Sequence, residues 1–137
     1  MSFVLDCSAT LAFILPDEGG IDPGLTGRLL AEGALVPSLW TLEVANCLLM
    51  AERRGRIAPE FRNAALADLA LLPISQDGET ARSAWGRTSD LAKAHHLTLY
   101  DATYLELALR LGLPLASLDR DLVGAAGAAG VPVLRVR

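Results

Sequence analysis

The sequence predicts an α/β fold: a three-layer α/β/α sandwich around a short-stranded, mainly parallel sheet. Segments with strand character alternate with segments of helical periodicity along the chain. The strand segments are short and apolar on both faces, which is typical of parallel strands covered by helices. No linker, repeat or low-complexity tract interrupts the 137 residues, so we expect one domain spanning 1–137.

The first elements follow from apolar runs and from the residues that break them. The run that begins the chain ends in Asp6, which predicts a buried strand, and Ser8 then opens a helix. The stretch from Pro16 to Gly20 breaks that helix, and Pro23 suits an early position of the next one. In chain order we expect a strand at 2–6, a helix at about 8–15, a helix at 22–32 and a strand at 34–36.

The middle of the chain contains two longer helices. Leu42 and Leu49 fall on one side of the first, and Gly55 stops it. Pro59 starts the second. We expect helices at 39–54 and at 59 to about 72, followed by a short strand at 72–74.

The last third of the chain alternates again between helix and strand. The pair His95 and His96 marks a helix C-terminus, where positive character is favourable. Tyr100 is expected to pack, and Gly112 ends the following helix. We expect helices at 79–96 and 101–111, a strand at 115–117, a helix of small residues at 120–129 and a final strand at 131–136.

Composition sets limits on partners and compartment. Hydrophobic residues make up 52% of the chain and the mean hydropathy is +0.36, which provides a large core and leaves apolar surface for a partner or an oligomer. No apolar stretch approaches the roughly 20 residues that span a bilayer, and no signal segment is visible, so we expect a cytoplasmic protein without membrane contact. The net charge of -4 has the wrong sign for binding nucleic acid through overall electrostatic attraction.

Two smaller features have an ordinary interpretation. Cys7 and Cys47 are not spaced as a metal or redox motif, so we expect reduced, small core residues. Arg53, Arg54 and Arg56 form a basic cluster after the helix at 39–54. That cluster is either a solvated helix end or a contact for RNA or a protein partner.

Acidic side chains recur where predicted elements meet loops. Asp6 ends the first strand, Asp101 and Asp119 stand where helices begin, and Glu43 lies among apolar residues of a helix. Taken singly, an Asp at such a position caps a helix, and a Glu is solvated. Taken together, they predict a cluster of carboxylates at the carboxyl ends of the strands, which needs a cation to hold it.

The ligand chemistry favours a hard divalent ion. Carboxylate oxygens suit Mg²⁺ or Mn²⁺, and the zinc-type spacing of Cys and His is absent from the sequence. Asn46 shares a helix face with Glu43, and Ser117 points the same way as Asp119 on an extended strand. Asp121 adds a further carboxylate.

At these residues the chain resembles the PIN-domain family, and specifically the VapC-type toxins of bacterial toxin–antitoxin pairs. Four blocks, in the family's order, carry the resemblance: Val4-Leu5-Asp6-Cys7-Ser8, Leu39 to Asn46, Leu99 to Ala108, and Leu115 to Leu122. The resemblance covers essentially the whole chain. It implies an α/β/α sandwich, Mg²⁺- or Mn²⁺-dependent endoribonuclease activity, a homodimer and a small antitoxin partner.

The resemblance also implies roles for single residues. It carries over Asp6, Glu43, Asp101 and Asp119 as the acidic site, the three aspartates as metal ligands, and Ser8, Asn46, Ser117 and Asp121 as supporting residues. In the expected reaction, a metal-activated water hydrolyses the RNA phosphodiester and leaves a 5′-phosphate. His95 and His96 stay open as further contributors.

Other functions remain as alternatives. A phosphoacceptor receiver domain needs a Lys after a late strand, whereas the only Lys, Lys93, lies in a predicted helix. An Asp-x-Asp phosphatase is disfavoured because position 8 is Ser8, and a DNase or flap nuclease is expected to bring extra clamp segments. The last alternative is a non-catalytic PIN-like interaction module whose acids only cap helices.

Overall fold

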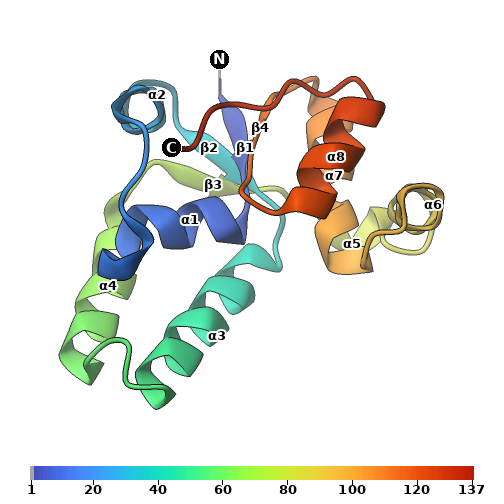
Figure 1. Cartoon of the computed structure of the whole chain (residues 1–137). Helices are drawn as coiled ribbons and strands as arrows, with labels where there is room; N and C mark the ends of the chain where they lie inside the picture. Colours follow the sequence, from blue (N-terminus) through green and yellow to red (C-terminus); the bar gives the residue numbers. More distant parts are fainter. Residues whose placement is uncertain (1) are drawn as a thin grey trace.

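The computed structural model describes residues 2–137, and Figure 1 shows helices gathered around a small sheet. Strands and helices alternate, as the sequence predicts. The strands are β1 (Phe3–Leu5), β2 (Ala34–Val36), β3 (Ile74–Gln76) and β4 (Leu115–Ala116). The helices are α1 (Cys7–Ile14), the 3₁₀ turn η1 (Pro16–Glu18), α2 (Pro23–Glu32), α3 (Trp40–Arg53), α4 (Pro59–Leu71), α5 (Thr80–Ser83), α6 (Arg87–His95), α7 (Leu99–Leu111) and α8 (Arg120–Ala128).

The sheet is parallel, with the strand order β3-β2-β1-β4. The chain builds outward from β1 to β2 and β3, and then returns to add β4 on the other side of β1. In open α/β sheets this reversal opens a crevice at the carboxyl ends of the two strands concerned. The α/β prediction is therefore confirmed, and the crevice is expected where β1 and β4 end.

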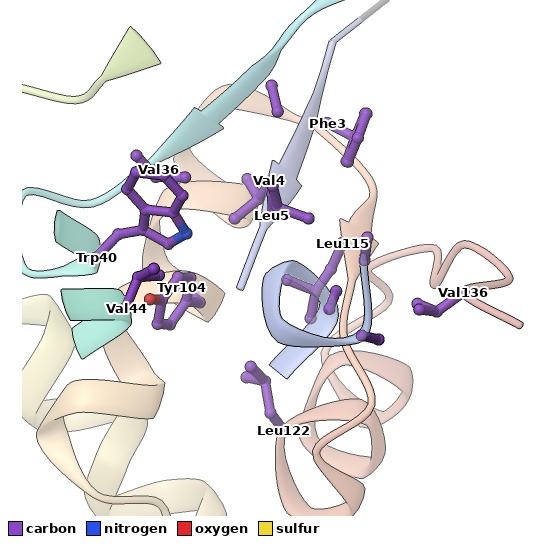
Figure 2. Close-up of a cluster of buried hydrophobic side chains, with 14 of the residues drawn as sticks. Phe3, Val4, Leu5, Val36, Trp40, Val44, Tyr104, Leu115, Leu122 and Val136 are labelled. Carbon is purple, nitrogen blue, oxygen red and sulfur yellow. The ribbon is translucent and has the colours of Figure 1, made fainter. Parts of the chain in front are cut away.

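Burial of the central strand shows that helices cover both faces of the sheet. All three residues of β1 are almost fully buried. On one face, Phe3 and Leu5 meet apolar residues of α1, α2 and α4. Helix α7 also packs against β1, and Figure 2 shows its Tyr104 gathered with Val36, Trp40 and Val44. Continuous burial of this kind explains why the strand reads as an unbroken apolar run.

Two predictions for residues 79–100 need correction, one for a helix and one for the packing of a side chain. The helix expected at 79–96 is two helices, because α5 ends at Ser83 and α6 begins at Arg87. Gly86 lies between them in a non-helical conformation, with φ -110° and ψ -107°, and glycine is a poor helix former. Tyr100 does not pack in the core, since it is 66% exposed.

Helix α7 begins two residues earlier than expected. Its N-cap is Thr98, whose Oγ1 accepts a hydrogen bond from the backbone N–H of Asp101 at 3.1 Å. Asp101 is therefore not the cap but lies inside the first turn of the helix. A carboxylate there still interacts favourably with the positive end of the helix dipole.

Two strand predictions are also adjusted. The third strand runs over Ile74–Gln76, after Pro73, whose carbonyl accepts the N–H of Ala34. The final segment, 131–136, is not a strand: Val133 makes only an isolated bridge to Leu115. Pro132 has no N–H to donate, so a regular ladder does not extend through this segment.

A partly buried ion cluster joins the end of β3 to α7. Arg110 donates to both carboxylate oxygens of Asp77, at 3.1 and 2.7 Å, and to Glu106 Oε1 at 2.8 Å. Glu106 is only 2% exposed, so it depends on Arg110 for its countercharge. Replacing Arg110 by Met is expected to lower the free energy of unfolding by about 3 kcal/mol, because two carboxylates are left without their cation. Urea denaturation at neutral pH measures this loss.

The exposed pair of Arg82 and Glu79, 3.3 Å apart, provides a matched control. Arg82→Met should lower the free energy of unfolding by less than about 0.5 kcal/mol.

Hydrogen bonds from Arg110 hold the pKa of Asp77 below its usual value. The stabilisation by this pair is thus present at neutral pH and is lost as the pH falls through the lowered pKa. An Arg110→Met loss that stays constant into acid would contradict this interpretation.

None of the helices within residues 2–137 is long and apolar enough to pass through a lipid bilayer.

Candidate active site

Asp6 stands where β1 ends and α1 begins. Its side chain caps α1: Oδ1 accepts the N–H of Ala9 at 2.9 Å and the hydroxyl of Ser8 at 2.8 Å. Its other oxygen, Oδ2, accepts the hydroxyl of Ser117 at 2.5 Å. Asp6 is only 4% exposed, and this burial raises its pKa against the effect of those hydrogen bonds. The capping and clustering interpretations of this residue are therefore compatible.

The end of β4 is fastened to the end of β1 by two serines. Ser117 donates to Asp6 and accepts the backbone N–H of Asp119 at 3.0 Å. Ser8 donates to Asp6 and accepts the backbone N–H of Leu118 at 2.8 Å. Asp119 in turn caps α8 by accepting the N–H of Leu122 at 2.9 Å. Asp6 and Asp119 thus lie at the crevice between the two strand ends, and the charge on Asp119 contributes to the raised pKa of Asp6.

The other two acids come from the first turns of α3 and α7. Glu43 is half-buried, and burial raises its pKa, with a further rise from the charges on Asp101 and Asp6. Burial also raises the pKa of Asp101, and the charges on Asp119 and Asp6 add to it. The charges of neighbouring acids thus contribute to the raised pKa of Asp6, Glu43 and Asp101, which shows that β1, β4, α3 and α7 direct the acids towards one region.

The cluster has the donor chemistry of a divalent-cation site. None of the salt bridges within residues 2–137 neutralises any of the four acids, Asp6, Glu43, Asp101 and Asp119. In the same residues, no three His, Cys, Asp or Glu side chains are grouped so that they hold a metal ion as they stand. Mg²⁺ commonly binds through one or two carboxylates and keeps several waters, so it does not require a closed set of protein ligands. The oxygen-only donors fit Mg²⁺ or Mn²⁺ bound partly through water.

The supporting residues divide into two groups. Ser8 and Ser117 hold Asp6, and the charge of exposed Asp121 adds to the raised pKa of Asp101. Within residues 2–137 no hydrogen bond connects Asn46, which is exposed, to the acids. His95 lies in the last turn of α6 and His96 is its C-cap, with φ 55°, as expected for a helix end.

The basic cluster lies at the far end of α3. Arg53 is ten residues after Glu43, or about 15 Å along the helix axis. Arg54 is exposed, while Arg56 binds both oxygens of Asp17 at 2.9 Å. Arg53 is therefore too far along the helix from Glu43 to contact an ion held at the acids.

The two cysteines are neighbours beside the acids. Their sulfur atoms lie 3.8 Å apart, and both cysteines are free and half-buried. Burial raises the pKa of Cys7, and the surrounding negative groups raise it further, so Cys7 stays a protonated thiol. A protonated thiol is a weak nucleophile, which favours a packing role.

Tyr104 is a site residue that the sequence interpretation did not include. It is buried in α7, and its hydroxyl donates to Glu43 Oε1. The usable signal was its spacing, because Tyr104 lies three residues after Asp101 and so on a neighbouring part of the same helix face. The spacing does not reveal that this face meets α3.

Curated relatives match nearly the whole chain. Ribonuclease VapC3 of Pyrobaculum aerophilum is 31% identical over 126 residues, which cover 89% of this chain and 92% of that protein. The chain belongs to the VapC family of PIN-domain proteins. Ribonuclease VapC3 of Mycobacterium tuberculosis is also 31% identical, over 124 residues covering 89% of this chain and 85% of the relative. No protein-family model matches the chain.

Solved structures share the fold of this VapC-family chain. PAE2754 of Pyrobaculum aerophilum superposes with a TM-score of 0.68 at 23% identity, covering 91% of this chain and 79% of the other. Mycobacterium tuberculosis VapC20, described as a toxin that cleaves the sarcin-ricin loop, superposes with a TM-score of 0.60 at 19% identity, covering 98% and 99%. At these identities the superpositions show the fold, whereas family membership rests on the sequence relatives.

Proposed function

We propose that this VapC-family protein is a Mg²⁺- or Mn²⁺-dependent endoribonuclease and the toxin of a toxin–antitoxin pair. The names of its relatives, which are ribonucleases, support the class of reaction. The observation that carries the proposal is the cluster of Asp6, Glu43, Asp101 and Asp119, which has no neutralising basic side chain among the described residues. The charges of neighbouring acids in this cluster help to raise the pKa of the first three. Such a cluster costs stability unless a cation binds to it.

In this proposal Asp6, Asp101 and Asp119 hold the cation, directly or through water. When bound, the cation lowers the pKa of a water molecule and offsets negative charge on the phosphate. Ser117 and Ser8 keep the Asp6 carboxylate oriented for this role. Glu43, in the first turn of α3, orients the attacking water.

The reaction is hydrolysis of a phosphodiester. The water oxygen forms a bond to phosphorus, the bond from phosphorus to the 3′ oxygen breaks, and that oxygen takes up a proton. One product carries a 5′-phosphate and the other a 3′-hydroxyl. The RNA 2′-hydroxyl is not consumed, so the chemistry needs no nucleophile from the substrate.

The partners follow from the same proposal. RNA is the substrate, a small antitoxin is the protein partner, and a homodimer acting in the cytoplasm is the working form. Exposed apolar side chains, among them Leu42, Leu71 and Trp85, provide surface for protein contacts. Arg53 and Arg54 are exposed and are available to RNA or to the antitoxin outside the acid cluster.

Incubation of the purified protein with RNA under controlled metal content tests the proposal. Cleavage is expected with Mn²⁺ or Mg²⁺, should stop in excess EDTA, and should return when the metal is restored. End-group analysis should find a 5′-phosphate. Cleavage that persists in excess chelator, or products with a 2′,3′-cyclic phosphate, would rule out the proposed chemistry.

A further inference from the structure

The hydroxyl of Tyr104 is a buried polar group whose partner is in the acid cluster. The side chain is 1% exposed and lies among the core residues of α7. Its O–H donates to Glu43 Oε1, across the boundary between α7 and α3. Figure 2 shows the Tyr104 ring beside Val44 and below Trp40, so the ring belongs to the core. The hydrogen bond to Glu43 connects its oxygen to the site.

Core packing alone does not explain a tyrosine at this position. A phenylalanine fills the same volume and carries no hydroxyl that must find a partner when buried. The hydroxyl of Tyr104 is satisfied by the carboxylate of Glu43. Within residues 2–137 no other hydrogen bond restrains the Glu43 side chain, so this contact alone fixes the carboxylate's direction.

Two further hydrogen bonds fix the first turn of α3 relative to Asp6. The indole N–H of Trp40 donates to Thr10 Oγ1 at 3.0 Å, and that hydroxyl donates to the backbone carbonyl of Asp6 at 2.8 Å. This buried chain sets the backbone that carries Glu43 relative to Asp6. The remaining freedom lies in the Glu43 side chain, which is half-buried and repelled by the charges of Asp6 and Asp101. Without a restraint, repulsion favours rotamers that turn the carboxylate away from the cluster.

We propose that Tyr104 is a positioning residue that holds the Glu43 carboxylate in the acid cluster, where Glu43 would support the divalent cation through the water bound to that cation. This inference rests on the proposed function, because it concerns the same site. It assigns the hydroxyl a task that is separate from the packing of the ring. Outer groups that orient a ligand contribute about 10- to 100-fold to metal affinity or activity.

The test compares Tyr104→Phe with Tyr100→Phe, which alter the chain's two tyrosines. Mn²⁺ affinity, measured by calorimetry without RNA, should fall about 10- to 100-fold in Tyr104→Phe. Tyr100 is exposed, so its variant should bind Mn²⁺ within about twofold of wild type. Thermal unfolding in excess EDTA checks that both variants are folded. An unchanged Mn²⁺ affinity in a folded Tyr104→Phe would overturn the proposal, even if stability had dropped.

A double-mutant cycle with Glu43→Gln tests whether Tyr104 acts through Glu43. In that background, Tyr104→Phe should change Mn²⁺ affinity by less than about twofold, because the oriented carboxylate is already absent. Additive losses would overturn the assignment. The proposed function is tested separately. If the wild type binds Mn²⁺ but leaves RNA intact, the nuclease proposal is refuted, whereas the role of Tyr104 is still decided by the Mn²⁺ affinity of Tyr104→Phe.

Discussion

Replacing Asp6 by Asn is expected to abolish RNA cleavage, by about 10³-fold or more, while the chain remains folded. Asp6 is the most buried of the four acids, and both of its oxygens are held in place by hydrogen bonds. Asn has nearly the same shape but no charge, so it removes a proposed metal ligand without opening a cavity. Rates on a defined RNA under single-turnover conditions measure the loss.

The same substitution should not weaken the metal-free protein. The oxygen of an Asn side chain still accepts the N–H of Ala9 at the start of α1, and its amide is able to donate to Ser117 Oγ. Burial raises the pKa of Asp6, which means that the folded state disfavours the charged form at neutral pH. Removing that charge should therefore leave the free energy of unfolding in EDTA unchanged or higher.

Asp22 provides the matched control, because it caps α2 in the way that Asp6 caps α1. Its side chain accepts the N–H of Gly24 at 3.1 Å, and its carboxylate lies next to Arg135 and away from the acid cluster. Asp22→Asn should cut RNA at the wild-type rate. If Asp6→Asn also cuts at that rate, Asp6 is only a cap. If Asp6→Asn unfolds, its carboxylate is needed for stability.

The acids at strand ends were the most predictable part of the site. An apolar run that stops at an acid indicates a buried strand with a carboxylate at its end, as at Asp6. Parallel strands share one carboxyl edge, so the region of Ser117 and Asp119 follows from the same reasoning once β4 pairs with β1. At these positions, local sequence thus predicts both the secondary-structure element and the direction of the side chain.

The structure differs from the sequence predictions for both local and tertiary reasons. The run at 79–96 has helical periodicity, but it breaks at Gly86, where the hydroxyl of Ser89 bonds the carbonyl of Ala84 at 2.6 Å. Asn46 shares a helix face with Glu43 but lies exposed and is not bonded to the acids in the described residues. Tyr104 was missed because its value depends on how α7 meets α3, and no local pattern specifies that pairing.

Mn²⁺ at about 100 times its dissociation constant should raise the free energy of unfolding by about 2.7 kcal/mol, because a cation that binds only the folded chain stabilises it by mass action. The expected site is the acid cluster, in which the charges on Asp119 and Asp6 add to the raised pKa of Asp101. Thermal unfolding with increasing Mn²⁺, at constant ionic strength, measures the gain. Asp101→Asn should show a much smaller gain, although it should remain folded in EDTA.

Asp90 separates a specific site from a general effect of charge. It lies exposed in the first turn of α6, as Asp101 lies in the first turn of α7, but it is not among the charges that raise the pKa of the site acids. Asp90→Asn should keep the full Mn²⁺ stabilisation. If both variants lose it equally, the ion acts on overall charge. If Mn²⁺ does not stabilise the wild type, its acids only cap helices or face solvent. An interaction module without metal chemistry then becomes the better interpretation. Stabilisation that is lost in Asp101→Asn alone requires a cation at the crevice where β1 and β4 end.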